Sequence, residues 1–193
     1  QVLDRLEDSR TGRLLPEGFH CAVPPERLAQ AQATAAILGE AVYRNYPWAH
    51  SGCGATSAFA LPTTQDPVQA LLRRTWEPTL SVTGAEGLPT LRNAGNVLRP
   101  YTAFKLSLRL PPLVDAATCV QELKALLEDN APYQAKVTWE VEGAANGWNA
   151  PDTAPWFAQA LDAASLAHFG AGVGYIGQGG TIPLMNMLSQ GFP

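Results

Sequence analysis

The chain has 193 residues, of which 46% are hydrophobic and 16% charged, and its formal net charge is −4; this length suffices for one sizeable core or two smaller units. Weak acidity without a Lys/Arg cluster argues against nucleic-acid binding, and no apolar run approaches the roughly 20 residues of a membrane-spanning helix. Cys21, Cys53 and Cys119 lack CxxC spacing, so we expect reduced thiols in the cytoplasm rather than a disulfide framework or a zinc knuckle.

The first part of the chain is predicted to be mainly helical. Residues 2–6 carry apolar side chains at helical spacing and are predicted to be the tail of a helix. Two prolines are expected to open a longer helix, which runs from Pro25 to about Tyr46. Residues 47–64 are rich in Gly, Ser, Thr and Ala and predict a surface loop. The pair Asp66-Pro67 then caps and begins a further helix.

Two strands, a helix and a third strand are predicted next. The first strand lies around residues 78–83, and the second spans 103–110, where apolar and polar residues alternate strictly. Asp115 is expected to cap a helix that ends near residue 129. Residues 134–142 alternate in the same way and predict the third strand.

This order predicts an α+β fold. With one strand added before Gln1, residues 1–142 read β-α-β-β-α-β, which is the ferredoxin-like split arrangement. The first of these strands would be missing from the chain, and about residues 16–76 would form a helical insertion.

Residues 143–193 are predicted to form a separate unit that begins with a linker, in which Trp148 and Asn149 are expected to pack. A helix capped by Asp152 or Thr153 should follow and close at Gly170. A short strand, a glycine-rich turn and the start of another helix complete the segment.

Three features are candidates for ligand binding, and each has a structural alternative. The turn Gly177–Thr181 lies between a predicted strand and a predicted helix, where backbone N–H groups can bind an anion; a plain turn is the alternative. Arg109, on the polar face of its strand, can grip a carboxylate or simply face solvent. Asn96 can bind a ligand or stabilise its own turn. No zinc site can be read from the spacing of the three histidines, His20, His50 and His168.

The stretch GNVLRPYTAFKLSLRLPP, residues 95–112, resembles the dimerisation or lid domain of a family of dinuclear-zinc peptidases. This family includes carnosine dipeptidase, aminoacylase and succinyl-diaminopimelate desuccinylase. The matching positions of its turn and strand are Asn96, Val97, Pro100, Arg109, Leu110 and Pro112. The ending YIGQGGTIP is similar to the point where the family's chain re-enters its catalytic domain, and LDRLEDSRTGRLLPEGF is similar to the early lid of the carnosinase branch.

The resemblance implies a role for each candidate residue. The lid would form a homodimer, in which Asn96 and Arg109 reach the partner's active site as substrate ligands. Gly179, Gly180 and Thr181 would hold the terminal carboxylate of a small peptide or an N-acyl amino acid. The implied reaction is hydrolysis by two zinc ions that activate a bridging water, with a glutamate as general base.

The chain also departs from the family. The family's metal ligands and its general-base glutamate have no counterpart here, so this chain alone is expected to be inactive and to bind no metal. Gln178 stands where the carnosinase branch has glutamate, and Gly177 where carnosinase has arginine. The remaining alternative is a stand-alone, non-catalytic ferredoxin-like module that binds a ligand or a partner.

Overall fold

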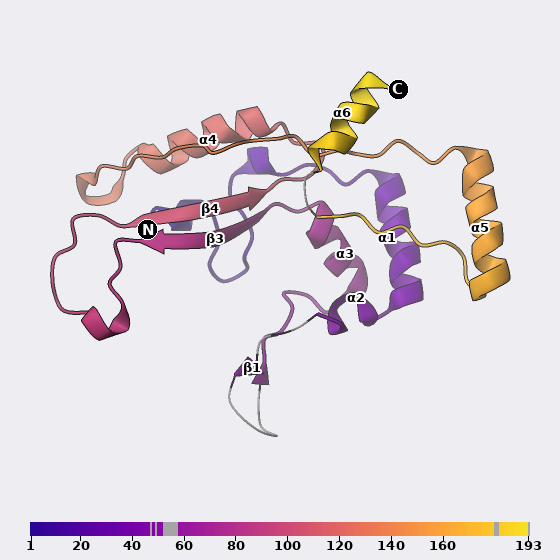
Figure 1. Ribbon diagram of the computed structural model, residues 1–193, viewed down its shortest axis with the longest axis horizontal. Coiled ribbons are helices and arrows are strands. Elements are labelled where there is room, and N and C mark those ends of the chain that lie inside the picture. The colour runs from indigo at the N-terminus through magenta and orange to yellow at the C-terminus, as the bar shows by residue number, and fades with distance from the viewer. Residues whose placement is uncertain (47, 49, 52–57, 180–181, 193) are drawn as a thin grey trace.

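The computed structural model describes residues 1–46, 48, 50–51, 58–179 and 182–192, and its elements are arranged along one long axis (Figure 1). The helices are α1 (Pro25–Leu38), α2 (Ala41–Arg44), α3 (Pro67–Thr75), α4 (Ala116–Glu128), α5 (Pro155–Phe169) and α6 (Pro183–Gly191). The strands are β1 (His50–Ser51), β2 (Ala58–Phe59), β3 (Thr79–Glu86) and β4 (Ala103–Arg109). This mixture of helices and small antiparallel sheets agrees with the predicted α+β class.

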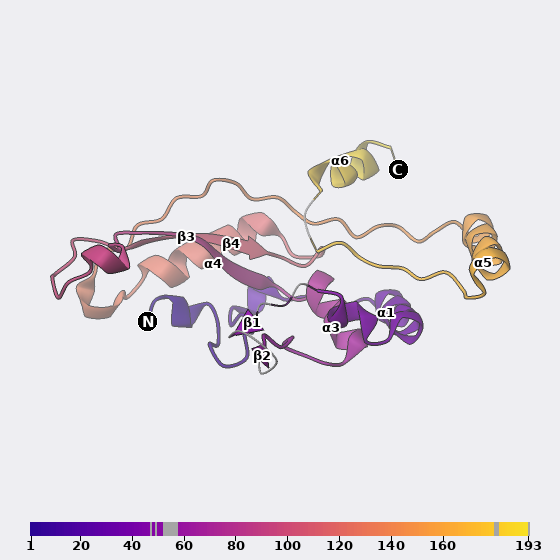
Figure 2. The same cartoon turned by 60° about the horizontal axis from the view of Figure 1, so that its bottom comes forward.

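The hairpin of β3 and β4 forms the larger of the two sheets. Its antiparallel register pairs Thr79 with Arg109 and Glu86 with Ala103, with an irregularity between Val82 and Gly84. The predicted alternation holds for Leu106 and Leu108, which are half-buried between exposed neighbours, whereas Phe104 at the start of the same face is 46% exposed. Helix α4 lies along the hairpin (Figures 1 and 2) and covers this apolar face.

Two apolar clusters hold the molecule together. The first joins the N-terminal segment, α4 and the hairpin, and its buried members are Leu6, Leu14, Phe19, Val114, Cys119, Leu123 and Leu127. The second joins the three helices α1, α2 and α3, and its buried members are Ala31, Ala35, Val42, Leu71, Leu72 and Trp76. The predicted helical insertion is thus built as a small helical layer with a core of its own.

Two helix predictions need correction. The predicted helix from Pro25 to Tyr46 is broken at Gly39, whose φ of +52° ends α1, and only the single turn of α2 follows. The predicted helix tail at residues 2–6 is a 3-10 turn, Leu3–Arg5, after which the chain doubles back to bridge Glu7 to Leu14.

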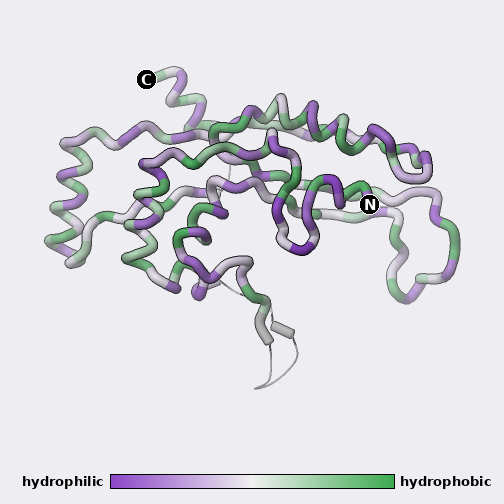
Figure 3. The backbone as a smooth tube through the Cα atoms, turned by 180° about the vertical axis from the view of Figure 1, so that it is seen from behind, coloured by the Kyte–Doolittle hydropathy of each residue, from purple (hydrophilic) through white to green (hydrophobic). Residues whose placement is uncertain are grey.

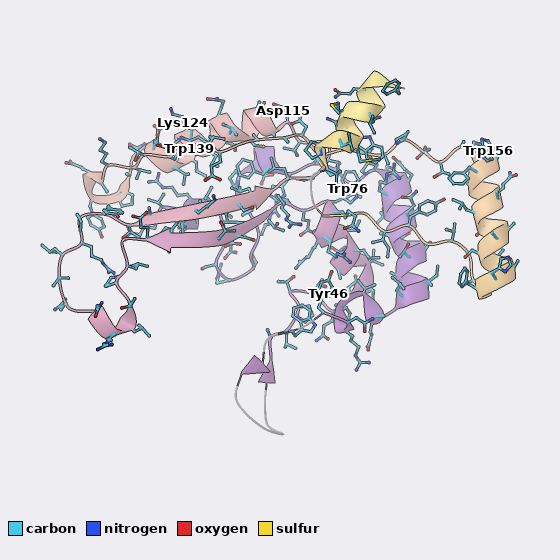
Figure 4. The ribbon with its side chains drawn as sticks, in the orientation of Figure 1. Tyr46, Trp76, Asp115, Lys124, Trp139 and Trp156 are labelled. Atoms are coloured by element: carbon cyan, nitrogen blue, oxygen red, sulfur yellow. The ribbon has the colours of Figure 1, made fainter. Side chains whose placement is uncertain are left out.

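The predicted strand at 134–142 is also wrong as a strand. The 3-10 turn Pro132–Gln134 leads into an extended segment without ladder partners. Val137 and Trp139 still pack on the first cluster (Figure 4), which explains the alternation. In the split arrangement the last strand pairs with the first, and no described residue supplies that first strand. The described part of the chain therefore contains a two-stranded hairpin, and the ferredoxin-like split stays a prediction.

The C-terminal segment matches its prediction in part. Helix α5 ends at Gly170, whose φ of +70° is left-handed, as expected. Its N-cap is Ala154, without a capping side chain, so neither Asp152 nor Thr153 takes that role. The short strand expected before the glycine-rich turn is absent from residues 171–179, whereas α6 begins after the turn as predicted.

Asp115 caps α4 as predicted, and this cap predicts a pH dependence. Hydrogen bonds from the hydroxyl and the backbone N–H of Thr118 hold the pKa of its carboxyl below the ordinary value of 3.8. A lowered pKa in the folded state means that the cap stabilises the protein above about pH 3.8 and is lost as the pH falls through the folded value. Asp115→Asn should therefore lower Tm near neutral pH and make Tm fall less steeply as the pH is lowered. Glu140→Gln, which changes an exposed carboxyl, is the control. The same dependence of Tm on pH below neutrality in Asp115→Asn and the wild type would contradict this prediction.

No helix in the described ranges is both long and apolar enough to cross a membrane.

Candidate functional site

Arg109 and Gly179, two of the residues predicted to bind substrate, lie together. Arg109 is the last residue of β4, on the exposed face of the hairpin. Its Nη1 donates a hydrogen bond to the carbonyl oxygen of Gly179, although the two residues are 70 positions apart in the chain. The structure thus places the guanidinium at the glycine-rich turn of its own chain.

Close approach of the backbone explains the glycines of this turn. The segment 171–179 returns from α5 and passes over α1 and α3. A Cβ at Gly177 would lie 2.7 Å from Cγ2 of Thr75, and one at Gly179 would collide with the carbonyl oxygen of Arg74. Any side chain at either position would push the segment off α3. Gly180 and Thr181, the rest of the predicted carboxylate cradle, lie outside the described residues.

Asn96 is not part of this arrangement. It is exposed in the loop 87–102, which joins β3 to β4 at the end of the hairpin opposite Arg109. Ala103 and Arg109 mark the two ends of β4, about 20 Å apart for a strand of this length. Within one chain, Asn96 and Arg109 therefore lie at opposite ends of the hairpin.

A cavity of about 460 Å³ lies beside the Arg109–Gly179 contact. Its walls come from α1, α3, the paired ends of β3 and β4, the two segments that lead to and from α5, and the start of α6. This volume is in the range of small-molecule sites. The guanidiniums of Arg27, Arg74 and Arg109 line it together with a single carboxylate, Glu77, so its charge suits an anionic ligand.

Two polar groups of the cavity wall were not predicted as site residues. The indole Nε1 of Trp148 is buried without a hydrogen-bond acceptor among the described residues, so a ligand oxygen could accept a hydrogen bond from it. Arg27 reaches the linker, where its Nε donates to Oδ1 of Asn149 at 3.1 Å. The prediction that Trp148 and Asn149 pack in the linker is confirmed for Asn149 by this bond. Nothing local in the sequence marks Arg27, since its partner lies 122 positions away.

Several titratable side chains that the structure describes have local structural roles. No three His, Cys, Asp or Glu side chains in the described ranges gather as metal ligands. His20 is used internally, with Nε2 hydrogen-bonded to the carbonyl of Leu14 at 2.8 Å. Burial raises the pKa of the Cys21 and Cys119 thiols, which favours the unreactive thiol form.

The comparisons agree with a partial peptidase fold. No family model matches the sequence, and no curated protein matches it significantly. Among solved structures, human carnosine dipeptidase 1 matches with a TM-score of 0.61 and 18% identity, over 98% of this chain and 38% of that chain. The di-peptidase Dug1p from Saccharomyces cerevisiae matches with a TM-score of 0.62 and 19% identity, over 98% of this chain and 38% of that chain. The M20 family metallo-carboxypeptidase Sso-CP2 from Sulfolobus solfataricus matches with a TM-score of 0.59 and 15% identity, over 97% of this chain and 45% of that chain.

These matches confirm, at the level of the fold, the resemblance found in the sequence. The chain spans less than half the length of each of the three proteins. It therefore shares its fold with a part of these metallopeptidases rather than with the whole.

Proposed function

We propose that this chain is the lid, together with the adjoining start of the second half of the catalytic domain, of a cytoplasmic, zinc-dependent M20-type dipeptidase or N-acyl-amino-acid hydrolase. The lid would comprise residues 1–142 with the insertion at about 16–76, and residues 143–193 would belong to the catalytic domain. The observation that carries the proposal is the fold likeness over 98% of the chain to a part of human carnosine dipeptidase 1. The contact between Arg109 and Gly179 agrees with it, because both residues were expected at the substrate.

The uncovered faces of α5 and α6 support the view that further protein surrounds this chain. No described helix or strand lies close alongside either helix, although Met185 of α6 borders the cavity. Hydrophobic residues (green in Figure 3) occur on both, and Trp156 at the start of α5 is 73% exposed (Figure 4). Apolar helix faces of this kind are normally buried against other elements. The remaining catalytic domain would cover them and supply the metal ligands and the general base.

The chain's own residues would bind and orient the substrate. The planar guanidinium of Arg109 offers paired donors to a carboxylate or a polarised carbonyl oxygen. Backbone N–H groups of the turn at Gly179, Gly180 and Thr181 would hold the terminal carboxylate. Two zinc ions, bound elsewhere in the parent protein, would supply the activated water.

The hairpin geometry supports a homodimer. Because Asn96 lies at the opposite end of the hairpin from Arg109, the two can serve one active site only if they come from different copies. The arrangement that the resemblance implies, in which one copy sends both residues to its partner's site, does not fit this geometry. The two-stranded sheet also has unpaired outer edges in the described part of the chain, and such edges readily pair with another copy.

The test uses the full-length protein that contains this sequence. We expect it to hydrolyse dipeptides or N-acyl amino acids with a free carboxylate, to lose activity on chelation and to regain it with zinc. The 193-residue chain alone should be inactive and bind no stoichiometric zinc. Absence of hydrolysis by the zinc-loaded full-length protein, together with binding of a ligand or partner by the chain alone, would favour the stand-alone module instead.

A further inference from the structure

Helix α5 is joined to the rest of the molecule only by the two segments that lead to and from it, as far as the described residues show. The outgoing segment comprises residues 143–154 and the returning segment residues 171–179. Both pass over α1 (Figures 1 and 2), and each is held there by one side chain of that helix.

Arg27 holds the outgoing segment. Its Nε donates to Oδ1 of Asn149 at 3.1 Å, and its Nη2 donates to the carbonyl oxygen of Ala150. Its Nη1 donates to Oε1 of Gln30 on the same helix at 2.9 Å, which fixes the guanidinium in place. The side chain is only 14% exposed, so these bonds are sheltered from water and are stronger than surface contacts.

Thr34 holds the returning segment. Its side chain is almost completely buried, with 2% of the residue exposed. Oγ1 accepts a hydrogen bond from the N–H of Tyr175 at 3.0 Å and donates one to the carbonyl oxygen of the same residue at 2.9 Å. One hydroxyl thus satisfies both backbone groups of Tyr175, as a neighbouring strand would.

The spacing of the two side chains makes α1 a common support. Arg27, Ala31 and Thr34 follow one another at i, i+4 and i+7 and therefore share one face of the helix. Ala31 is small and buried in the second cluster, which fixes α1 to α3. Helix α3 in turn contacts Gly177 and Gly179 through Thr75 and the carbonyl of Arg74. Motion of the returning segment relative to α1 would therefore change the distance between Arg109 and the glycine-rich turn, and motion of the outgoing segment would shift another wall of the same cavity.

We propose that α1 is a clamp on both connections to α5, and that Arg27 and Thr34 are positioning residues that keep the glycine-rich turn in register with Arg109. The clamp is a property of the fold, whereas its effect on catalysis rests on the function proposed above. Neither residue needs to touch substrate for this role.

Amide hydrogen exchange of the full-length protein tests the clamp without any assay of activity. Thr34→Val keeps the shape of the side chain but removes both bonds to Tyr175, so exchange of the Tyr175 amide should become at least about tenfold faster. Thr34→Ser keeps the hydroxyl and should retain the protection. Exchange at Tyr175 that is equal in the two variants would overturn the proposal. So would a loss of protection of the same size in α4, which would show that Thr34 serves general stability alone.

Steady-state kinetics test the consequence for the site. Thr34→Val and Arg27→Met should each raise KM by about tenfold and lower kcat, because the substrate ligands are no longer held in register. Thr34→Ser should restore both constants, and Arg44→Met, which removes an exposed pair with Glu40 on α2, should change neither. Unaltered constants in both clamp variants would overturn the positioning role. An inactive wild-type protein would refute the proposed function, but the exchange result would still decide whether the clamp exists.

Discussion

Replacing Arg109 with methionine in the full-length protein should lower kcat/KM by about 100-fold or more, since a guanidinium that binds the reacting substrate cannot be replaced by water. The residue is exposed at the end of β4, and its polar contact is to the backbone of Gly179. The fold should therefore survive the change, with Tm close to that of the wild type. Arg109→Lys should recover only part of the activity, because an ammonium group lacks the planar pair of donors.

Arg10→Met is the matched control. Arg10 is an exposed arginine whose ion pair with Asp8 is local, so its loss should leave kcat/KM unchanged. A loss of activity equal to that of Arg109→Met would point to a general effect of charge. An Arg109→Met protein with full activity would remove Arg109 from the site.

Mixed dimers decide which copy uses Arg109. The resemblance implies that Arg109 serves the partner's site, whereas the structure brings it to Gly179 of its own chain. Gly179→Val should inactivate the protein, because the new side chain collides with the carbonyl of Arg74. If Arg109 serves the partner, randomly mixed Arg109→Met and Gly179→Val subunits should regain about a quarter of wild-type activity, since each heterodimer contains one intact site. The contact with Gly179 within one chain favours no recovery, whereas recovery to about a quarter would assign Arg109 to the partner's site, as the resemblance implies.

Local signals in the sequence were sufficient for most elements. Strict alternation located β4, and an acidic cap located the starts of α3 and α4, where Asp66 and Asp115 accept hydrogen bonds from backbone N–H groups as expected. These features involve residues within a few positions of each other. They can therefore be predicted from the sequence without any knowledge of the tertiary structure.

Periodicity reports burial rather than pairing, which explains the wrong strand at 134–142. Val137 and Trp139 bury one face of that segment on the first cluster, but its backbone has no ladder partner among the described residues. Similarly, apolar residues continue past the end of α1, and only the positive φ of Gly39 shows that the helix stops there.

The roles of the proposed site residues stay predictions. Motif resemblance selected Arg109 and Gly179, which the structure places in contact, yet the reason for the glycines was not visible. Gly177 and Gly179 are needed where the returning segment meets α3, a contact between residues about 100 positions apart in sequence. Thr34 was equally hidden, because a threonine inside a helix gives no sign that its hydroxyl binds Tyr175.

Leu14 and Leu15 are adjacent, but their replacement by alanine should have very different effects on stability. Leu14 is 0% exposed in the first cluster, between the N-terminal segment and α4, whereas Leu15 is 45% exposed. Leu14→Ala removes buried methyl groups and leaves a cavity, so the free energy of unfolding should fall by about 3–5 kcal/mol. Leu15→Ala should cost less than about 1 kcal/mol, because most of its surface already meets water.

Urea denaturation of the 193-residue chain measures both values, with the midpoint shifted and the m-value unchanged if only the core is weakened. This cluster also holds α4 against the hairpin that carries Arg109. Loss of Leu14 should therefore loosen the hairpin before the helical layer of α1 and α3, which has a separate core. Equal losses for Leu14→Ala and Leu15→Ala would mean that the N-terminal segment does not close the first cluster.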